Sequence, residues 1–158
     1  MQQVAFQAQR VTPDTQKIHR VCFICTGNTC RSPMAAAVYN HLHKGEPCRA
    51  ISCGTAAADG DPIHPNAVEA LKKAGIDSGP GNDYEGHLSQ PITRQIVDKA
   101  DQLICLSSSH ALAVLCGFPD CASKISVLGD IADPWGGDQD TYDQTLAQIM
   151  EALSPDES

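Results

Sequence analysis

Short apolar runs alternate with amphipathic segments along most of this chain. Uninterrupted apolar runs of about four to eight residues are typical of strands buried on both faces, whereas apolar residues spaced three and four apart predict helices. The pattern predicts strands at residues 19–25, 49–54, 101–106 and 124–128. It predicts helices at residues 33–43, 66–74, 91–100, 109–115 and 141–153, with Ser89 as the cap of the third.

The order of these segments indicates the fold class. Strands that alternate with helices are joined by right-handed crossovers, which place helices on both faces of a parallel sheet. A chain of 158 residues is long enough for one well-buried domain and too short for two ordinary ones. We therefore expect a single doubly wound α/β domain with a four-stranded parallel sheet over residues 18–158. The polar residues 1–17 are expected to form a flexible tail before it.

Charge and composition disfavour nucleic acids and membranes as binding partners. The net charge of −8 disfavours binding to the phosphate backbone of DNA or RNA. No apolar run reaches the roughly 20 residues needed to cross a bilayer, and the N-terminus lacks the apolar stretch of a secretory signal. We expect a cytoplasmic, monomeric protein that binds neither nucleic acid nor a membrane.

The eight cysteines suggest disulfides, zinc or reduced thiols. A disulfide framework is disfavoured because there is no export signal and Cys22, Cys53 and Cys105 lie in apolar, strand-like runs. Zinc is disfavoured because the C-x-x-C pair of Cys22 and Cys25 has no second pair at finger-like spacing. We therefore expect reduced thiols and no metal.

A turn between the first strand and the first helix is the main candidate site. After Cys25 the chain reads Thr26, Gly27, Asn28, Thr29, Cys30, Arg31, Ser32 and Pro33. Gly27 and Asn28 tolerate a positive φ, so successive backbone N–H groups can turn inward and form a nest for an anion. The helix that starts at Pro33 directs its positive end at the same point.

Two side chains of this turn predict phosphate chemistry. The planar fork of Arg31 can hold two phosphate oxygens. Together with the N–H groups and the helix dipole, its charge favours the thiolate form of Cys25 near neutral pH. A thiolate beneath a bound phosphate is aligned for in-line attack. The spacing C-x5-R is weak evidence by itself, and the alternative is that Cys25 is a buried thiol at a strand end.

The segment VCFICTGNTCRSPMA resembles the phosphate-binding loop of the low-molecular-weight protein tyrosine phosphatases and of their relatives, the bacterial protein-arginine phosphatases. The resemblance covers nearly all of residues 19–153 and includes SCGT at 52–55, a loop with His87 and IADPWGGD at 131–138. It implies hydrolysis of a phosphorylated protein through a phosphocysteine intermediate, with neither a metal nor an organic cofactor.

The resemblance assigns to Asp133 the role of general acid and then general base. The leaving group needs a proton and the attacking water must lose one, so one carboxyl group can serve both steps. Asp133 follows the fourth predicted strand, at the same sheet edge as Cys25, and Trp135 is available to pack on substrate. The alternative for this segment is a simple turn, because Asp-Pro often initiates one.

Four residues match positions that support the loop in the family. The resemblance implies that Asn28, Ser32, Ser52 and His87 form a hydrogen-bond network that holds it in shape. A left-handed Asn costs free energy unless its side chain is tied down, so such a network is physically required. Each of these residues taken singly is also compatible with an ordinary cap or surface polar group.

The preferred substrate depends on Thr29 and Trp135. Tyrosine phosphatases of the family usually carry a bulkier apolar residue where this chain has Thr29, and they commonly place two aromatic residues after Asp-Pro. Here a single Trp135 is followed by Gly136 and Gly137. We therefore expect hydrolysis of phosphoarginine, with phosphotyrosine as the alternative. Ala36 departs from the arginine-phosphatase pattern, which usually has Glu there.

Two other functional classes remain open. Thioredoxin-coupled arsenate reductases share the fold and loop but need two further redox cysteines, for which Cys116 and Cys121 are available. A non-catalytic phosphate-binding module would be expected to lose Cys25 or Asp133, and both are present.

Cys30 suggests redox regulation of the loop. Oxidation of the Cys25 thiolate gives a sulfenic acid, which a neighbouring thiol can trap as a disulfide. We therefore expect a reversible Cys25–Cys30 disulfide after exposure to peroxide.

Overall fold

The computed structural model describes residues 17–154. The expected tail at residues 1–17 lies outside the described residues, apart from Lys17.

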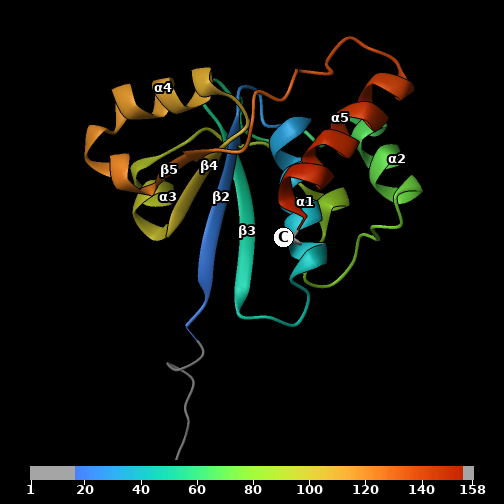
Figure 1. The fold of residues 1–158 in the computed structure, drawn as a ribbon, viewed down its shortest axis with the longest axis horizontal. Helices are drawn as coiled ribbons and strands as arrows, with labels where there is room; N and C mark the ends of the chain where they lie inside the picture. Colours follow the sequence, from blue (N-terminus) through green and yellow to red (C-terminus); the bar gives the residue numbers. More distant parts are fainter. Residues whose placement is uncertain (1–16, 155–158) are drawn as a thin grey trace, which may run out of the picture.

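Four parallel strands form the central sheet, which confirms the predicted fold class (Figure 1). They are β2 (His19–Cys25), β3 (Cys48–Gly54), β4 (Gln102–Cys105) and β5 (Ile125–Val127). Their order across the sheet is β3-β2-β4-β5, so β2 lies between the two strands that follow it in the chain. The carboxyl end of β2 is therefore the switch point at which doubly wound folds bind ligands.

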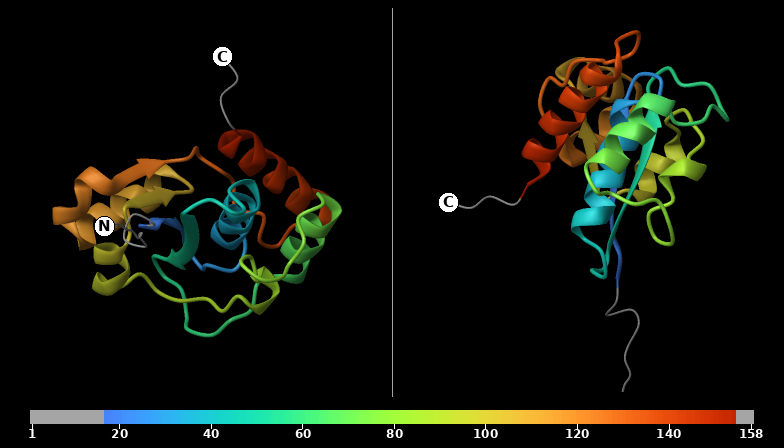
Figure 2. Two further views of the ribbon diagram at one scale, coloured as in Figure 1. Left: turned by 90° about the horizontal axis from the view of Figure 1, so that it is seen from below. Right: turned by 90° about the vertical axis from the view of Figure 1, so that its right-hand side faces the viewer.

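Helices cover both faces of the sheet, as predicted (Figure 2). The α-helices of the described chain are α1 (Arg31–Leu42), α2 (Pro65–Lys73), α3 (Arg94–Lys99), α4 (Ser108–Gly117) and α5 (Gln139–Leu153). Two 3-10 helices are also present: η2 (Tyr84–Gly86) lies between α2 and α3, and η3 (Pro119–Lys124) lies between α4 and β5. Helices α1, α2 and α5 pack on one face, whereas α3 and α4 pack on the other.

Strand β2 belongs to both cores. Val21 and Phe23 pack under α1 and α5, whereas Cys22 and Ile24 pack under α3 and α4. All four side chains are fully buried. This two-sided burial explains why the strand reads as an uninterrupted apolar run.

The third helix differs from its prediction. It begins at Arg94, and Thr93 is its cap, with the side-chain oxygen accepting from the backbone N–H of Ile96. Ser89 instead bonds to Ala58 and Asp61 in the preceding loop. The reason is that residues 90–92 stay extended: Gly54 donates its N–H to Gln90 and accepts from Ile92.

The free edge of β3 is covered by two side-chain amides. Asn40 on α1 donates to the carbonyl of Ala50 at 3.1 Å and accepts from its N–H at 2.8 Å. Gln90 donates from Nε2 to the carbonyl of Ser52 at 3.0 Å. These amides take the place of a neighbouring strand and block pairing with another chain.

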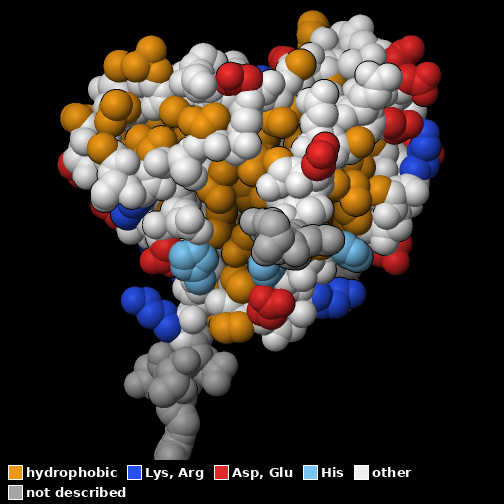
Figure 3. All heavy atoms as spheres, in the orientation of Figure 1, with side chains coloured by type: hydrophobic (Ala, Val, Ile, Leu, Met, Phe, Trp, Pro, Cys, Tyr) orange, Lys and Arg blue, Asp and Glu red, His pale blue; other side chains and the backbone are white. Residues whose placement is uncertain are grey.

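Acidic residues outnumber basic ones in this chain, 19 to 11. Figure 3 shows acidic side chains along the side formed by α2 and α5, while histidine side chains gather at the end where α1 meets β3. Within residues 17–154, no helix has the length and apolar character to cross a membrane.

Candidate active site

The loop at residues 26–30 joins the carboxyl end of β2 to the N-terminal end of α1, and Asn28 fixes its shape. Asn28 is fully buried and has a φ of 60°, the only positive φ of a non-glycine residue within residues 17–154. The sequence permits a positive φ at Gly27 as well, but Gly27 does not adopt one. A left-handed residue costs about 1–2 kcal/mol, so the conformation of Asn28 depends on its partners.

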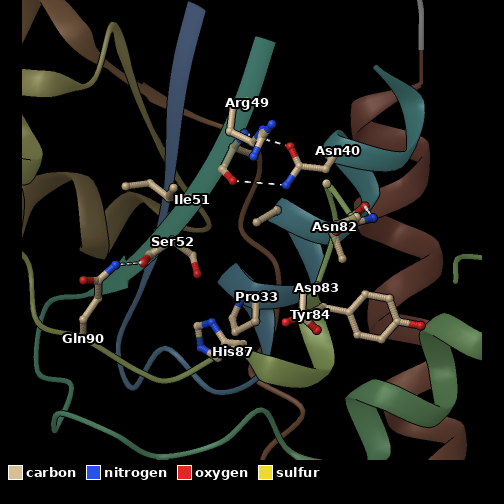
Figure 4. Close-up of a pocket in the computed structure, with 14 residues that line it drawn as sticks. Pro33, Asn40, Arg49, Ile51, Ser52, Asn82, Asp83, Tyr84, His87 and Gln90 are labelled. Carbon is tan, nitrogen blue, oxygen red and sulfur yellow. Dashed lines mark hydrogen bonds between the residues drawn. The ribbon is translucent and has the colours of Figure 1, made fainter. Parts of the chain in front are cut away.

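Four hydrogen bonds hold Asn28 in place. Its Nδ2 donates to the hydroxyl oxygens of Ser32 and Ser52, at 2.8 and 2.9 Å. Its Oδ1 accepts from the backbone N–H of Gln90 at 2.9 Å, and its carbonyl accepts from His87 Nε2 at 2.8 Å. The structure therefore brings together the supporting residues expected from the sequence, and it adds Gln90. Figure 4 shows Ser52, His87 and Gln90 beside the N-terminal end of α1.

The hydrogen bond from His87 to the Asn28 carbonyl also determines which ring nitrogen of His87 carries the proton. A carbonyl oxygen only accepts, so Nε2 carries the proton and the neutral ring leaves Nδ1 as an acceptor. Burial lowers the pKa of His87, and the bond to Asn28 opposes this shift. The imidazole is therefore neutral at pH 7.

Cys25 is buried at the bottom of the loop, with 2% of its surface exposed. Its Sγ lies 2.9 Å from Ser32 Oγ. This oxygen already accepts from Asn28, and the Ser32 hydroxyl can donate either to the sulfur at 2.9 Å or, over a longer distance of 3.5 Å, to the carbonyl of Cys53.

Arg31 connects the loop to the segment that carries Asp133. Its guanidinium is almost completely buried, donates from Nη1 to the carbonyl of Ile131 at 3.0 Å and lies 3.7 Å from Asp133 Oδ2. About half of the Asp133 side chain is exposed, and its Oδ1 accepts from the backbone N–H of Trp135. The acid therefore lies at the mouth of the site, with the arginine inside.

These groups surround one cleft of about 360 Å³. It is lined by Cys25, Thr26, Gly27, Asn28, Thr29, Cys30, Arg31, Ala56, Ala58, Asp61, Asp133 and Trp135. The cleft contains every loop residue expected from the sequence, together with the expected acid and aromatic residue. Ser32, Ser52 and His87 do not line it and lie behind the loop.

Comparison with known proteins identifies the family of this chain. The model of the family described as low molecular weight phosphotyrosine protein phosphatase matches residues 20–155. This chain belongs to that family. It is therefore a cysteine-dependent phosphatase.

Several relatives of this phosphatase are named for phosphoarginine. A protein-arginine-phosphatase of Bacillus subtilis is 32% identical, over 84% of this chain and 91% of its own length. One from Geobacillus stearothermophilus is 35% identical, over 78% and 84%. A structure of the arginine phosphatase YwlE with a phosphorylated active-site serine has a TM-score of 0.75 at 32% identity, covering 85% of this chain and 90% of that one. Relatives named as a tyrosine phosphatase and an arsenate reductase are 28% and 34% identical.

His110 is a site residue of the phosphatase that sequence reasoning missed. It is buried on α4, with Nε2 2.9 Å from Thr26 Oγ1 and Nδ1 3.0 Å from Ser107 Oγ. Burial, and next the charge of Arg31, lowers its pKa. Its place just after β4, at the ligand-binding edge of the sheet, was the signal that could have identified it.

Tyr142 on α5 was also missed. Its hydroxyl lies 3.5 Å from Cys30 Sγ, and its ring stacks on His64 with the centroids 4.8 Å apart. Burial raises the pKa of the Cys30 thiol, so Cys30 stays protonated at neutral pH. No local sequence pattern connects Tyr142 with the loop, because the contact spans 112 positions.

The remaining sequence-derived candidates lie away from the cleft. Ala36 lines a neighbouring pocket of about 370 Å³ between α1 and β3, so its departure from the family pattern does not alter the cleft (Figure 4). Cys116 is exposed on α4 and Cys121 is buried on η3, and neither lines the cleft.

We predict that Asn28→Ala lowers kcat/KM by about 100-fold, because the loop loses the contacts that position its N–H groups. Asn28→Gly is the matched variant: glycine adopts a positive φ freely, so it removes the side-chain bonds alone. Urea unfolding should show Asn28→Gly to be less stable than the wild type, and Asn28→Ala less stable by about 1 kcal/mol more. Full activity in Asn28→Gly would show that the side chain does not support the loop.

We predict that the protein loses stability as the pH falls below about 6.5, because the unfolded chain then binds protons at positions 87 and 110 that the folded protein resists. The measurement is the free energy of unfolding in urea between pH 7.5 and about 5. His110→Gln should make the dependence on pH shallower, whereas the exposed His41→Gln should not. Equal slopes in all three proteins would contradict this assignment.

We predict that peroxide inactivates the protein reversibly through a Cys25–Cys30 disulfide, since both residues line the same cleft. Thiol reductant should restore activity to the wild type, whereas Cys30→Ser should become irreversibly oxidised at Cys25. Cys116→Ser, which removes an exposed thiol, should behave as the wild type. Sulfonic acid at Cys25 of the oxidised wild type, with no disulfide in its mass spectrum, would exclude this mechanism.

Proposed function

We propose that this phosphatase hydrolyses phosphoarginine in proteins, through a phosphocysteine formed on Cys25. The phosphoryl group would sit in the nest of loop N–H groups, with two of its oxygens held by Arg31. Negative charge on the phosphoryl oxygens is stabilised by this fixed set of donors and by the N-terminal end of α1.

The first step forms the phosphocysteine. The Cys25 thiolate attacks phosphorus as the bond from phosphorus to the guanidine nitrogen breaks, and Asp133 donates a proton to that nitrogen. The contact of Arg31 with Asp133 keeps the carboxyl group at the mouth of the cleft that Cys25 also lines, and this position is compatible with proton transfer to the leaving group.

The second step regenerates the enzyme. Asp133, now ionised, takes a proton from a water molecule that attacks the phosphocysteine, and inorganic phosphate leaves. The sulfur departs as a thiolate, which the Ser32 hydroxyl stabilises from 2.9 Å away. No step requires a metal ion or an organic cofactor.

Thr29 is the observation that carries the choice of phosphoarginine. It lines the cleft beside Cys30, with its Oγ1 3.8 Å from Cys30 Sγ. A branched polar side chain at this place narrows the cleft against a phenyl ring. Among the described residues, Trp135 is the only aromatic one that lines the cleft, and it is 71% exposed. The cleft therefore lacks the second aromatic wall that would enclose a phenol, while the Asp133 carboxylate can pair with a guanidinium.

We predict that the protein has a higher kcat/KM for a phosphoarginine peptide than for a phosphotyrosine peptide of matched sequence. Thr29→Ile should lower this ratio by about tenfold or more, the range expected from reshaping one wall of a pocket. Thr29→Val keeps the branched shape without the hydroxyl, so it separates the shape of the residue from its polarity. Cys25→Ser provides the blank.

A preference for phosphotyrosine in the wild type would contradict the arginine assignment and leave the proposed roles of Cys25, Arg31 and Asp133 intact. Arsenate reduction is disfavoured by the positions of Cys116 and Cys121 outside the cleft.

A further inference from the structure

The turn between α1 and β3 brings together three side chains that bind metals in other proteins. The ligand atoms of His43, Glu46 and Cys48 all lie within 4.8 Å of one another. His43 Nδ1 is 2.9 Å from Glu46 Oε1, and Cys48 Sγ is 3.8 Å from the same oxygen. We propose that this turn binds a zinc ion through His43 Nδ1, a Glu46 carboxylate oxygen and the Cys48 thiolate.

The spacing of these atoms is close to what zinc requires. Bonds of about 2.0 Å to nitrogen and oxygen and about 2.3 Å to sulfur, at tetrahedral angles, place the ligand atoms about 3.3–3.6 Å apart. The His43–Glu46 separation is slightly shorter than this value, and the Cys48–Glu46 separation is slightly longer. Small rotations of exposed or half-buried side chains therefore suffice to form the site.

The backbone of the turn already has the shape that chelation needs. Glu46 N–H donates to the carbonyl of His43 at 3.0 Å, and Cys48 N–H donates to the carbonyl of Glu46 at 2.8 Å. Gly45 supplies the one positive φ of the turn, at 82°. Because the three ligands come from six consecutive residues of a fixed turn, binding does not have to order the chain.

Tyr39 packs against one of the ligands. Its ring lies against the imidazole of His43, with the centroids 4.2 Å apart. This contact restricts the orientations that the imidazole can take.

The surroundings predict a reversible site with one open position. The ligands face a pocket of about 190 Å³, which leaves room for water as the fourth ligand. A thiolate and a carboxylate neutralise the charge of the ion, but Lys44 and Arg49 also line the pocket and weaken the attraction for a cation. The affinity should therefore be lower than that of a closed structural zinc site with four protein ligands.

Zinc at this turn would link the end of α1 to the start of β3. The phosphate loop lies at the opposite end of α1, which spans twelve residues and is about 18 Å long. The ion therefore stabilises the fold without taking part in hydrolysis, and this inference does not depend on the proposed substrate.

Cobalt(II) is the probe for the first test, because its bond to a thiolate gives a charge-transfer absorption band. The catalytic sulfur must be distinguished from Cys48, so the titration is run on wild type, Cys25→Ser, Cys48→Ser and the exposed-thiol control Cys116→Ser. The band should persist in Cys25→Ser and Cys116→Ser, disappear in Cys48→Ser and be displaced by zinc. Glu46→Gln and His43→Asn should each weaken binding at least tenfold.

A thermal readout tests the same site in a second way. Zinc should raise the Tm of the Cys25→Ser variant by several degrees in a concentration-dependent manner. It should not raise the Tm of the double variant that carries both Cys25→Ser and Cys48→Ser. Phosphatase activity of Cys48→Ser should equal that of the wild type, with or without a chelator. Absence of the cobalt band in the wild type, its retention in Cys48→Ser or its loss in Cys25→Ser would each overturn the proposal.

Discussion

The phosphate loop depends on keeping one asparagine in a left-handed conformation. Without bonding partners, the asparagine would return to a right-handed or extended conformation and lower the free energy by about 1–2 kcal/mol. Four bonds from Ser32, Ser52, Gln90 and His87 prevent this. These partners come from α1, β3 and the chain between η2 and α3, so the loop is held by elements on different sides of it. The shape of the catalytic loop is thus a property of the whole sheet edge.

The same arrangement offsets the repulsion between the negatively charged protein and a negatively charged phosphoryl group. A net charge of −8 repels a phosphoryl group at long range. The site compensates locally, with a nearly buried guanidinium, the N-terminal end of α1 and backbone N–H groups. Arg31 is held by the carbonyl of Ile131, so in the proposed mechanism its guanidinium is already ordered before phosphate binds.

Much of this could be read from the sequence, because it is encoded locally. Strand β2 follows from an uninterrupted apolar run, and the loop follows from residues that are adjacent in the chain. The predicted start of α3 was wrong, because the backbone of Gln90 and Ile92 pairs with Gly54, and a local sequence pattern does not reveal this long-range contact. Gln90, His110 and Tyr142 were missed for a related reason: each meets the loop across 62 to 112 positions. The turn at His43, Glu46 and Cys48 was overlooked because its spacing resembles no familiar ligand motif.

Gln90 connects two parts of the molecule that have separate purposes. Its side chain covers the free edge of β3, and its backbone N–H holds Asn28. A strand from another chain added to this edge would compete with the Gln90 side chain for the carbonyl of Ser52. Position 90 therefore has two separate constraints: its side chain protects the sheet edge, and its backbone must stay where the loop needs it.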